Sequence, residues 1–228
     1  MSIKCFFLLS LSILTLNSKQ KTFTIMLDPA GDAQHAGRKI GDHLERGPSL
    51  RFAESIQDSI KESHSDIRVV LTRFPGETIQ PRQNASFANR LDVDLYISIH
   101  FFKQTTQKSL FHLFFFCIDP TTDFWSIPNT ELVFLKSNEI HKQSITTSKQ
   151  WTYLLFDALQ SYKNIFTLSQ PLGIPFKPLY GIKSPSIGIE VSLNHPEDWI
   201  RYVQPLQNSI STLIAHAKKE KGYRGIFS

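Results

Sequence analysis

The sequence predicts an α/β fold in a single domain, with a mostly parallel central sheet flanked by helices. Short apolar runs alternate with longer segments of helical periodicity from about residue 23 to residue 219, and this alternation is typical of a layered parallel sheet. The length of 228 residues suits one domain. A hydrophobic share of 41% is sufficient for a packed core.

The first half of the chain predicts three strands and two helices. Residues 23–27 form a buried strand that ends at Asp28-Pro29, and residues 48–62 carry apolar side chains at helical spacing. Residues 67–72 (IRVVLT) are rich in β-branched side chains and predict a second strand. Residues 81–91 predict a helix with Pro81 in its first turn, and residues 95–100 (LYISIH) predict the third strand.

The second half predicts two further strands and two helices. Residues 110–118 are an apolar run and predict the fourth strand, followed by a loop over residues 119–130, which hold prolines and threonines. A long helical region spans residues 131–160, with an interruption expected near Thr146. Residues 187–191 (IGIEV) predict the last strand. Residues 199–219 predict a closing helix with one apolar face.

The N-terminus resembles an export signal. Lys4 precedes the apolar stretch CFFLLSLSILTL and the polar NSKQK, and about 12 apolar residues are too few to span a bilayer. We therefore expect a signal peptide at residues 1–18, a catalytic domain at residues 22–220 and a periplasmic or extracellular location without a membrane span; a retained N-terminal anchor is the alternative. Of the two cysteines, Cys5 lies in this signal, so Cys117 is expected as a core thiol without a disulfide partner.

The charge pattern favours an anionic partner and argues against nucleic acid. The formal net charge is +5 at pH 7, but the lysines and arginines form no dense run. A nucleic-acid-binding chain usually carries such a run or a clustered basic face.

Several chemically active side chains lie at or near the ends of the predicted strands. His100 ends one strand, Glu190 lies inside another, and Asp32 and His35 follow the first strand, with Glu45 further along. Functional groups of parallel sheets gather at the carboxyl ends of the strands. A carboxylate in an apolar strand is costly unless it is paired or bound to a cation. Because zinc hydrolases use three His, Glu, Asp or Cys ligands and an open water position, these residues are candidates for a zinc site at this edge.

Four segments together resemble one known family. The stretch LTRFPGETIQPRQNASFANRLDVDLYISIH contains Leu-Thr-Arg, Ala-Asn, an Asp before the strand and Ser-Ile-His in order, and PSIGIEVSLNHPEDW contains Pro-Ser, a strand with Glu and a closing turn. The opening IMLDPAGDAQHAGR and the segment LERG precede them. In this order and spacing, from about residue 23 to 216, they resemble the zinc-dependent N-acetylmuramoyl-L-alanine amidases.

The resemblance implies roles for individual residues. It makes Glu45 and His100 zinc ligands and Glu190 the catalytic carboxylate. The first ligand departs from the family, because an ungapped alignment from Asp28 puts Gly31 where the family has its histidine. We expect His35 to supply this ligand, since imidazole is a good zinc donor, and Asp32 is the alternative.

The implied activity is zinc-dependent hydrolysis of the amide between N-acetylmuramic acid and L-alanine in peptidoglycan. The altered first loop motivates one alternative, a catalytically inactive wall-binding module of the same fold; a zinc peptidase acting on wall peptides is another. A protein activator is a possible partner. The helical region near residues 131–165 corresponds in position to a regulatory helix of some family members, and whether it is autoinhibitory stays open. Phe101 and Phe102, where the family has small or polar residues, either narrow the groove or pack under the next loop.

Overall fold

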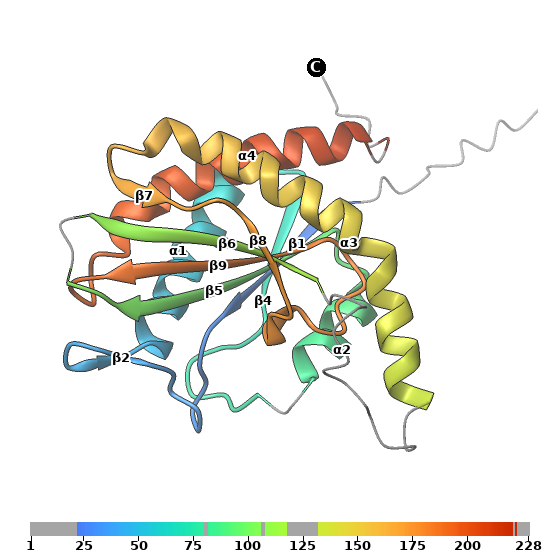
Figure 1. Cartoon of the computed structure of the whole chain (residues 1–228), viewed down its shortest axis with the longest axis horizontal. Helices are drawn as coiled ribbons and strands as arrows, with labels where there is room; N and C mark the ends of the chain where they lie inside the picture. Colours follow the sequence, from blue (N-terminus) through green and yellow to red (C-terminus); the bar gives the residue numbers. More distant parts are fainter. Residues whose placement is uncertain (1–21, 80–81, 106–107, 118–131, 221, 223–228) are drawn as a thin grey trace, which may run out of the picture.

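A seven-stranded, mostly parallel sheet forms the centre of the molecule (Figure 1). The computed structural model describes residues 22–79, 82–105, 108–117, 132–220 and 222, with only the backbone for residues 132–143. The strand order is β4-β1-β5-β9-β6-β7, and β8 also pairs with β6. The strands are β1 (Phe23–Pro29), β4 (Ile67–Leu71), β5 (Leu95–Lys103), β6 (Ser109–Phe116), β7 (Phe166–Leu168), β8 (Leu172–Ile174) and β9 (Ser186–Leu193).

One pair of central strands departs from the parallel arrangement. β1 runs parallel to β4 and β5, and β5 runs parallel to β9. β6 is antiparallel to β9. The carboxyl ends of β1, β5 and β9 therefore lie at the same edge of the sheet, the side to which the arrowheads of β5 and β9 point in Figure 1.

Three helices cover one face of the sheet. They are α1 (Arg46–Ser63), α3 (Leu132–Leu159) and α4 (Ile200–Glu220). The alternate residues of β1, β5 and β9 that face this layer are apolar and fully buried, as with Ile25, Ile97 and Ile189. They join the apolar stripes of the helices in one core cluster. An apolar sheet face and apolar helix stripes exclude water only when they pack against each other. This packing explains why the three helices lie on this face of the sheet.

The opposite face carries a smaller core. α2 (Gln83–Leu91) and the short helix η2 (Lys177–Leu179) contribute to it. Met26 and Tyr96 from the sheet pack with Ala88, Leu179 and other residues there. In the described ranges no helix is both long and apolar enough to cross a membrane.

The predicted strands and long helices are present, with two kinds of difference. Local periodicity does not indicate the short strands β7 and β8, nor the two-residue strands β2 (Lys39–Ile40) and β3 (His43–Leu44) that pair as a hairpin. The interruption expected near Thr146 is wrong, because α3 continues through it. The signal peptide expected at residues 1–18 and the loop expected at residues 119–130 lie outside the described residues.

Candidate functional site

The loop after β1 is built around a glycine and a buried aspartate. Gly31 has a φ of 76°, and a Cβ there would lie 2.9 Å from the Arg46 Cβ. Asp32 is 7% exposed. Its Oδ1 accepts hydrogen bonds from the backbone N–H groups of Gln34 at 2.7 Å and His35 at 2.6 Å. These bonds, the one from His35 above all, outweigh the effect of burial and lower the pKa of Asp32 to about 2.

His35 extends away from this loop into solvent. Its side chain is 78% exposed, and its Nδ1 lies 3.4 Å from Asp32 Oδ2. Asp32 Oδ2 also accepts a hydrogen bond from the backbone N–H of Ile79 at 3.3 Å. The two candidates for the first zinc ligand therefore contact each other, and Asp32 is held by backbone groups of its own loop and of Ile79.

The β2–β3 hairpin brings Glu45 back beside Arg38. The backbone N–H of Glu45 donates to the Arg38 carbonyl at 2.8 Å, and the backbone N–H of Arg38 donates to Glu45 Oε2 at 3.0 Å. Gly37, with a φ of 79°, lies under the carboxylate, since a Cβ there would be 2.8 Å from Glu45 Oε2. Only a glycine permits this close approach at a positive φ.

Glu45 is buried, and both oxygens of its carboxylate accept hydrogen bonds. It is 3% exposed, and its Oε1 accepts the backbone N–H of Phe101 at 2.9 Å and lies 3.5 Å from His100 Nδ1. Burial raises the pKa of this carboxyl, but the interactions with His100 and then Arg38 outweigh burial and bring the pKa down to about 2. Glu45 is therefore an anion whose charge is balanced inside the site.

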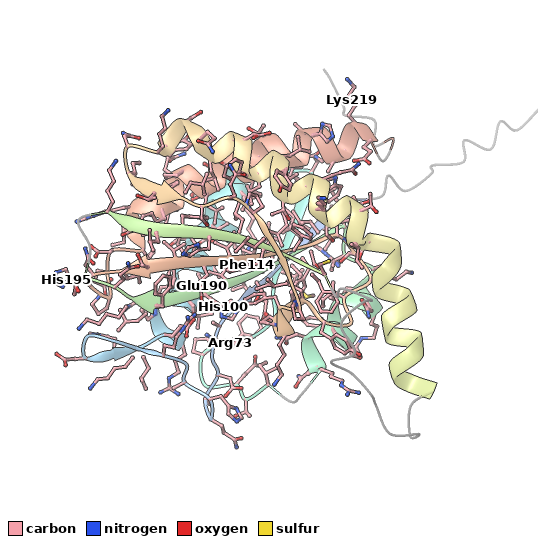
Figure 2. The ribbon with its side chains drawn as sticks, in the orientation of Figure 1. Arg73, His100, Phe114, Glu190, His195 and Lys219 are labelled. Atoms are coloured by element: carbon pink, nitrogen blue, oxygen red, sulfur yellow. The ribbon has the colours of Figure 1, made fainter. Side chains whose placement is uncertain are left out.

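His100 and Glu190 lie directly opposite each other on β5 and β9 (Figure 2). Ser98 on the same face of β5 contacts His100 Nε2 at 3.0 Å and donates to Asp28 Oδ2 at 3.0 Å. Asp28 Oδ1 accepts bonds from Thr72 and Asn84 at 2.8 and 2.7 Å. Asp28 therefore ties neighbouring elements together and orients His100 through Ser98.

Arg38 connects the two glutamates. Its Nε and Nη2 each lie 3.2 Å from a Glu45 oxygen, and its Nη1 donates to Glu190 Oε1 at 2.6 Å. Burial lowers the pKa of the guanidinium, but the hydrogen bonds to Glu45 and Glu190 outweigh burial and raise the pKa above its ordinary value. Sequence reasoning missed Arg38; the only signal was a Gly-Arg pair shortly before Glu45.

The donor set does not fit a catalytic zinc ion. Such an ion needs three protein ligands and an open position, and only Glu45 and His100 are adjacent as predicted. The glycine at the position of the family's histidine leaves no room for a side chain. Among the described residues, no group of three or more His, Cys, Asp or Glu side chains could hold a metal ion.

Other residues of the segments that resemble the family stabilise the loops at the carboxyl edge of the sheet. Arg73 is buried and donates to the carbonyls of Pro29, Ala30 and Arg46. Asn89 binds the backbone of Gly181 and Lys183. Hence these motif positions fix the loop after β1 and the chain leading into β9.

The two phenylalanines after His100 have different environments. Phe101 is fully buried and packs edge-on against Phe52, with ring centroids 5.4 Å apart. Phe102 is half-buried on the opposite face, stacks with His112 at 6.1 Å and lies 5.7 Å from the Arg38 guanidinium carbon. Of the two side chains, only that of Phe102 borders the site.

Comparison with known proteins assigns the family. The model of the family described as N-acetylmuramoyl-L-alanine amidase matches residues 25–217. The chain belongs to this family. Membership supports a peptidoglycan amidase activity, with peptidoglycan as the implied substrate. None of the curated proteins matches the chain.

Solved amidase structures share the fold at low sequence identity. An N-acetylmuramoyl-L-alanine amidase of Clostridium difficile 630 is 20% identical, with a TM-score of 0.62 over 88% of this chain and 99% of that one. The amidase Ami1 of Mycobacterium smegmatis is 14% identical, with a TM-score of 0.61 over 87% and 100%. The catalytic domain of CwlV from Bacillus (Paenibacillus) polymyxa is 14% identical, with a TM-score of 0.60 over 88% and 99%. The predicted fold and family are thus confirmed.

Proposed function

We propose that this member of the amidase family binds peptidoglycan at the amide between N-acetylmuramic acid and L-alanine without hydrolysing it. One observation carries the proposal. Glu45, His100 and Glu190 meet at the carboxyl edge of the sheet, but among the described residues no three His, Cys, Asp or Glu side chains are arranged so that they could hold a metal ion. The polar groups for contacting the linkage are therefore present, whereas the ligands for zinc-activated water are incomplete.

Hydrolysis of the same amide is the second candidate, and the position of Glu190 favours it. Glu190 pairs across the strands with His100, where a carboxylate would transfer a proton during hydrolysis. Zinc-dependent cleavage would require the loop at residues 31–37 to rearrange so that His35 or Asp32 becomes the third ligand. The three backbone hydrogen bonds to the Asp32 carboxylate oppose this rearrangement.

The proposed function also includes export of the chain and binding to a protein partner. A chain that contacts the wall polymer must leave the cytoplasm, and the pattern of residues 1–18 supports a cleaved signal. The relative CwlD of Clostridioides difficile has been solved in complex with the GerS lipoprotein. We propose that this chain also works with a protein partner, which would recruit it to the wall or activate it.

Incubation with purified peptidoglycan tests both candidates. The chain is mixed with insoluble peptidoglycan in the presence of zinc or of a chelator, the pellet is assayed for bound protein and the supernatant is analysed by mass spectrometry. We expect co-sedimentation that is unaffected by the chelator and no release of stem peptides beginning with L-alanine. Chelator-sensitive release of such peptides would establish the second candidate. Failure to co-sediment would reject the binding proposal.

A further inference from the structure

Arg38 lies where two carboxylates of the site need a cation. It contacts both oxygens of Glu45 and one oxygen of Glu190, at 3.2, 3.2 and 2.6 Å. Glu45 comes from the end of the β2–β3 hairpin and Glu190 from β9, 152 residues from Arg38 along the chain. The guanidinium thus links the β2–β3 hairpin to β9, two elements that lie far apart in the sequence.

The surrounding backbone holds the guanidinium in this position. The Glu45 backbone N–H donates to the Arg38 carbonyl, and the Arg38 backbone N–H donates to the Glu45 carboxylate, so the two residues close the hairpin. Gly37 lets the carboxylate approach, and the Phe102 ring lies 5.7 Å from the guanidinium carbon on another side. A cation beside an aromatic face gains further electrostatic attraction. Arg38 is therefore placed by the fold as well as by its ion pairs.

A zinc ion and this guanidinium would compete for the same oxygens. Zinc binds carboxylates at about 2.0–2.2 Å, so it would have to displace Arg38 from Glu45. The metal would gain Glu45 and His100 as adjacent donors, but it would break the ion pairs that Arg38 makes with Glu45 and with Glu190. At Gly31 the backbone and Arg46 fill the space that a third donor would need.

We propose that the Arg38 guanidinium replaces the metal ion of this family's site and is the permanent cation that holds Glu45 and Glu190 together. The inference explains how the site that the proposed binding function uses keeps its shape without zinc. It predicts that the native chain neither binds zinc stoichiometrically nor is stabilised by it. It also predicts that removing the guanidinium opens a cation site.

The test compares zinc binding and thermal unfolding of the full chain and three variants in the absence of peptidoglycan. Arg38→Met removes the charge and keeps much of the volume, and Arg38→Lys keeps a charge. Arg51→Met is the matched control, since Arg51 pairs with Glu197 at 2.9 Å and its side chain is 45% exposed, against 44% for Arg38. Zinc content is measured by elemental analysis after dialysis against zinc.

The native chain and Arg51→Met are expected to hold well below one zinc per molecule, with the same Tm in zinc and in chelator. Arg38→Met is expected to lower Tm by about 5 °C in chelator, because two carboxylates lose their partner, and zinc should restore part of this loss. The Tm of Arg38→Lys in chelator is expected to lie between those of the native chain and of Arg38→Met. One tightly bound zinc in the native chain, or an Arg38→Met variant as stable as Arg51→Met, would overturn the inference. If Arg38→Met does not fold, the zinc content of the native chain still decides. Because peptidoglycan is absent, a failure here is distinct from a failure of the binding function.

Discussion

At the scale of single residues, the charge of Glu45 makes stability depend on pH. The pKa of this carboxyl is lowered from 4.5 to about 2 in the folded chain. A lowered folded pKa stabilises the protein above the unfolded value and loses this contribution as pH falls toward the folded value. Glu45→Gln is therefore expected to reduce the free energy of unfolding by about 3 kcal/mol at pH 7.

Urea unfolding at several pH values measures this difference. The gap between the native chain and Glu45→Gln should shrink by more than half between pH 7 and pH 3. Glu197→Gln is a suitable control, because the Glu197 side chain is 56% exposed and pairs with Arg51 at the surface, where ion pairs contribute little. A gap for Glu45→Gln that stays constant with pH would show that the charge is not the cause.

Gly31 gives a second prediction at this scale. Gly31→His restores the residue type that the resemblance leads one to expect, but its φ is 76° and its Cβ would meet Arg46 at 2.9 Å. We expect a loss of about 2–3 kcal/mol in the free energy of unfolding, from backbone strain and overpacking together. Gly76→His separates the two causes, because Gly76 has a φ of 83° and open space around it. Equal losses in urea denaturation of the two variants would contradict the steric argument.

At the scale of elements, Arg73 connects the end of β4 to the loop after β1 and to α1. Its guanidinium donates to three backbone carbonyls and is buried, which lowers its pKa. Arg73→Met removes these three hydrogen bonds from the buried loop, so we expect the free energy of unfolding to fall by about 3 kcal/mol. Arg68→Met on the same strand, where the side chain is exposed, should change it by less than about 0.5 kcal/mol. Urea denaturation of both variants checks this; similar losses would contradict it.

The elements that the sequence predicted are those whose burial repeats over several residues. Phe23–Leu27 are buried along their whole length, and so are all residues of Ile187–Val191 except Glu190, so an apolar run indicates both strands. β2 and β3 have two residues each and their burial follows no period. β7 and β8 are short and depend on pairing with β6, a partner that local periodicity does not identify.

The site was predictable where a residue belongs to a motif and unpredictable where it depends on a distant contact. Resemblance placed Glu45, His100 and Glu190 at one edge, and the structure brings them there. Arg38 reaches Glu190 across 152 residues, and this ion pair exists only because the hairpin and β9 meet at the sheet edge. His35 was expected as a ligand from its residue type, but its side chain is 78% exposed, and residue type does not indicate this exposure.

At the scale of the whole molecule, the main core lies apart from the proposed binding groups. The main core lies between the sheet and the layer of α1, α3 and α4, whereas the proposed binding groups lie at the carboxyl edge. Leu206 on α4 is fully buried in that core. Leu206→Ala is expected to reduce the free energy of unfolding by about 3 kcal/mol through a cavity, without moving Arg38, Glu45 or Glu190.

Peptidoglycan binding should then follow the site and not the core. At a temperature well below its Tm, Leu206→Ala is expected to co-sediment with peptidoglycan as the native chain does. Arg38→Lys should co-sediment several-fold less, because an ammonium cannot reproduce the planar fork of donors between the two carboxylates. Binding measured beside urea unfolding for both variants tests the separation. If binding fell in proportion to stability in both variants, recognition would depend on the whole fold, and the carboxyl edge would have no special role.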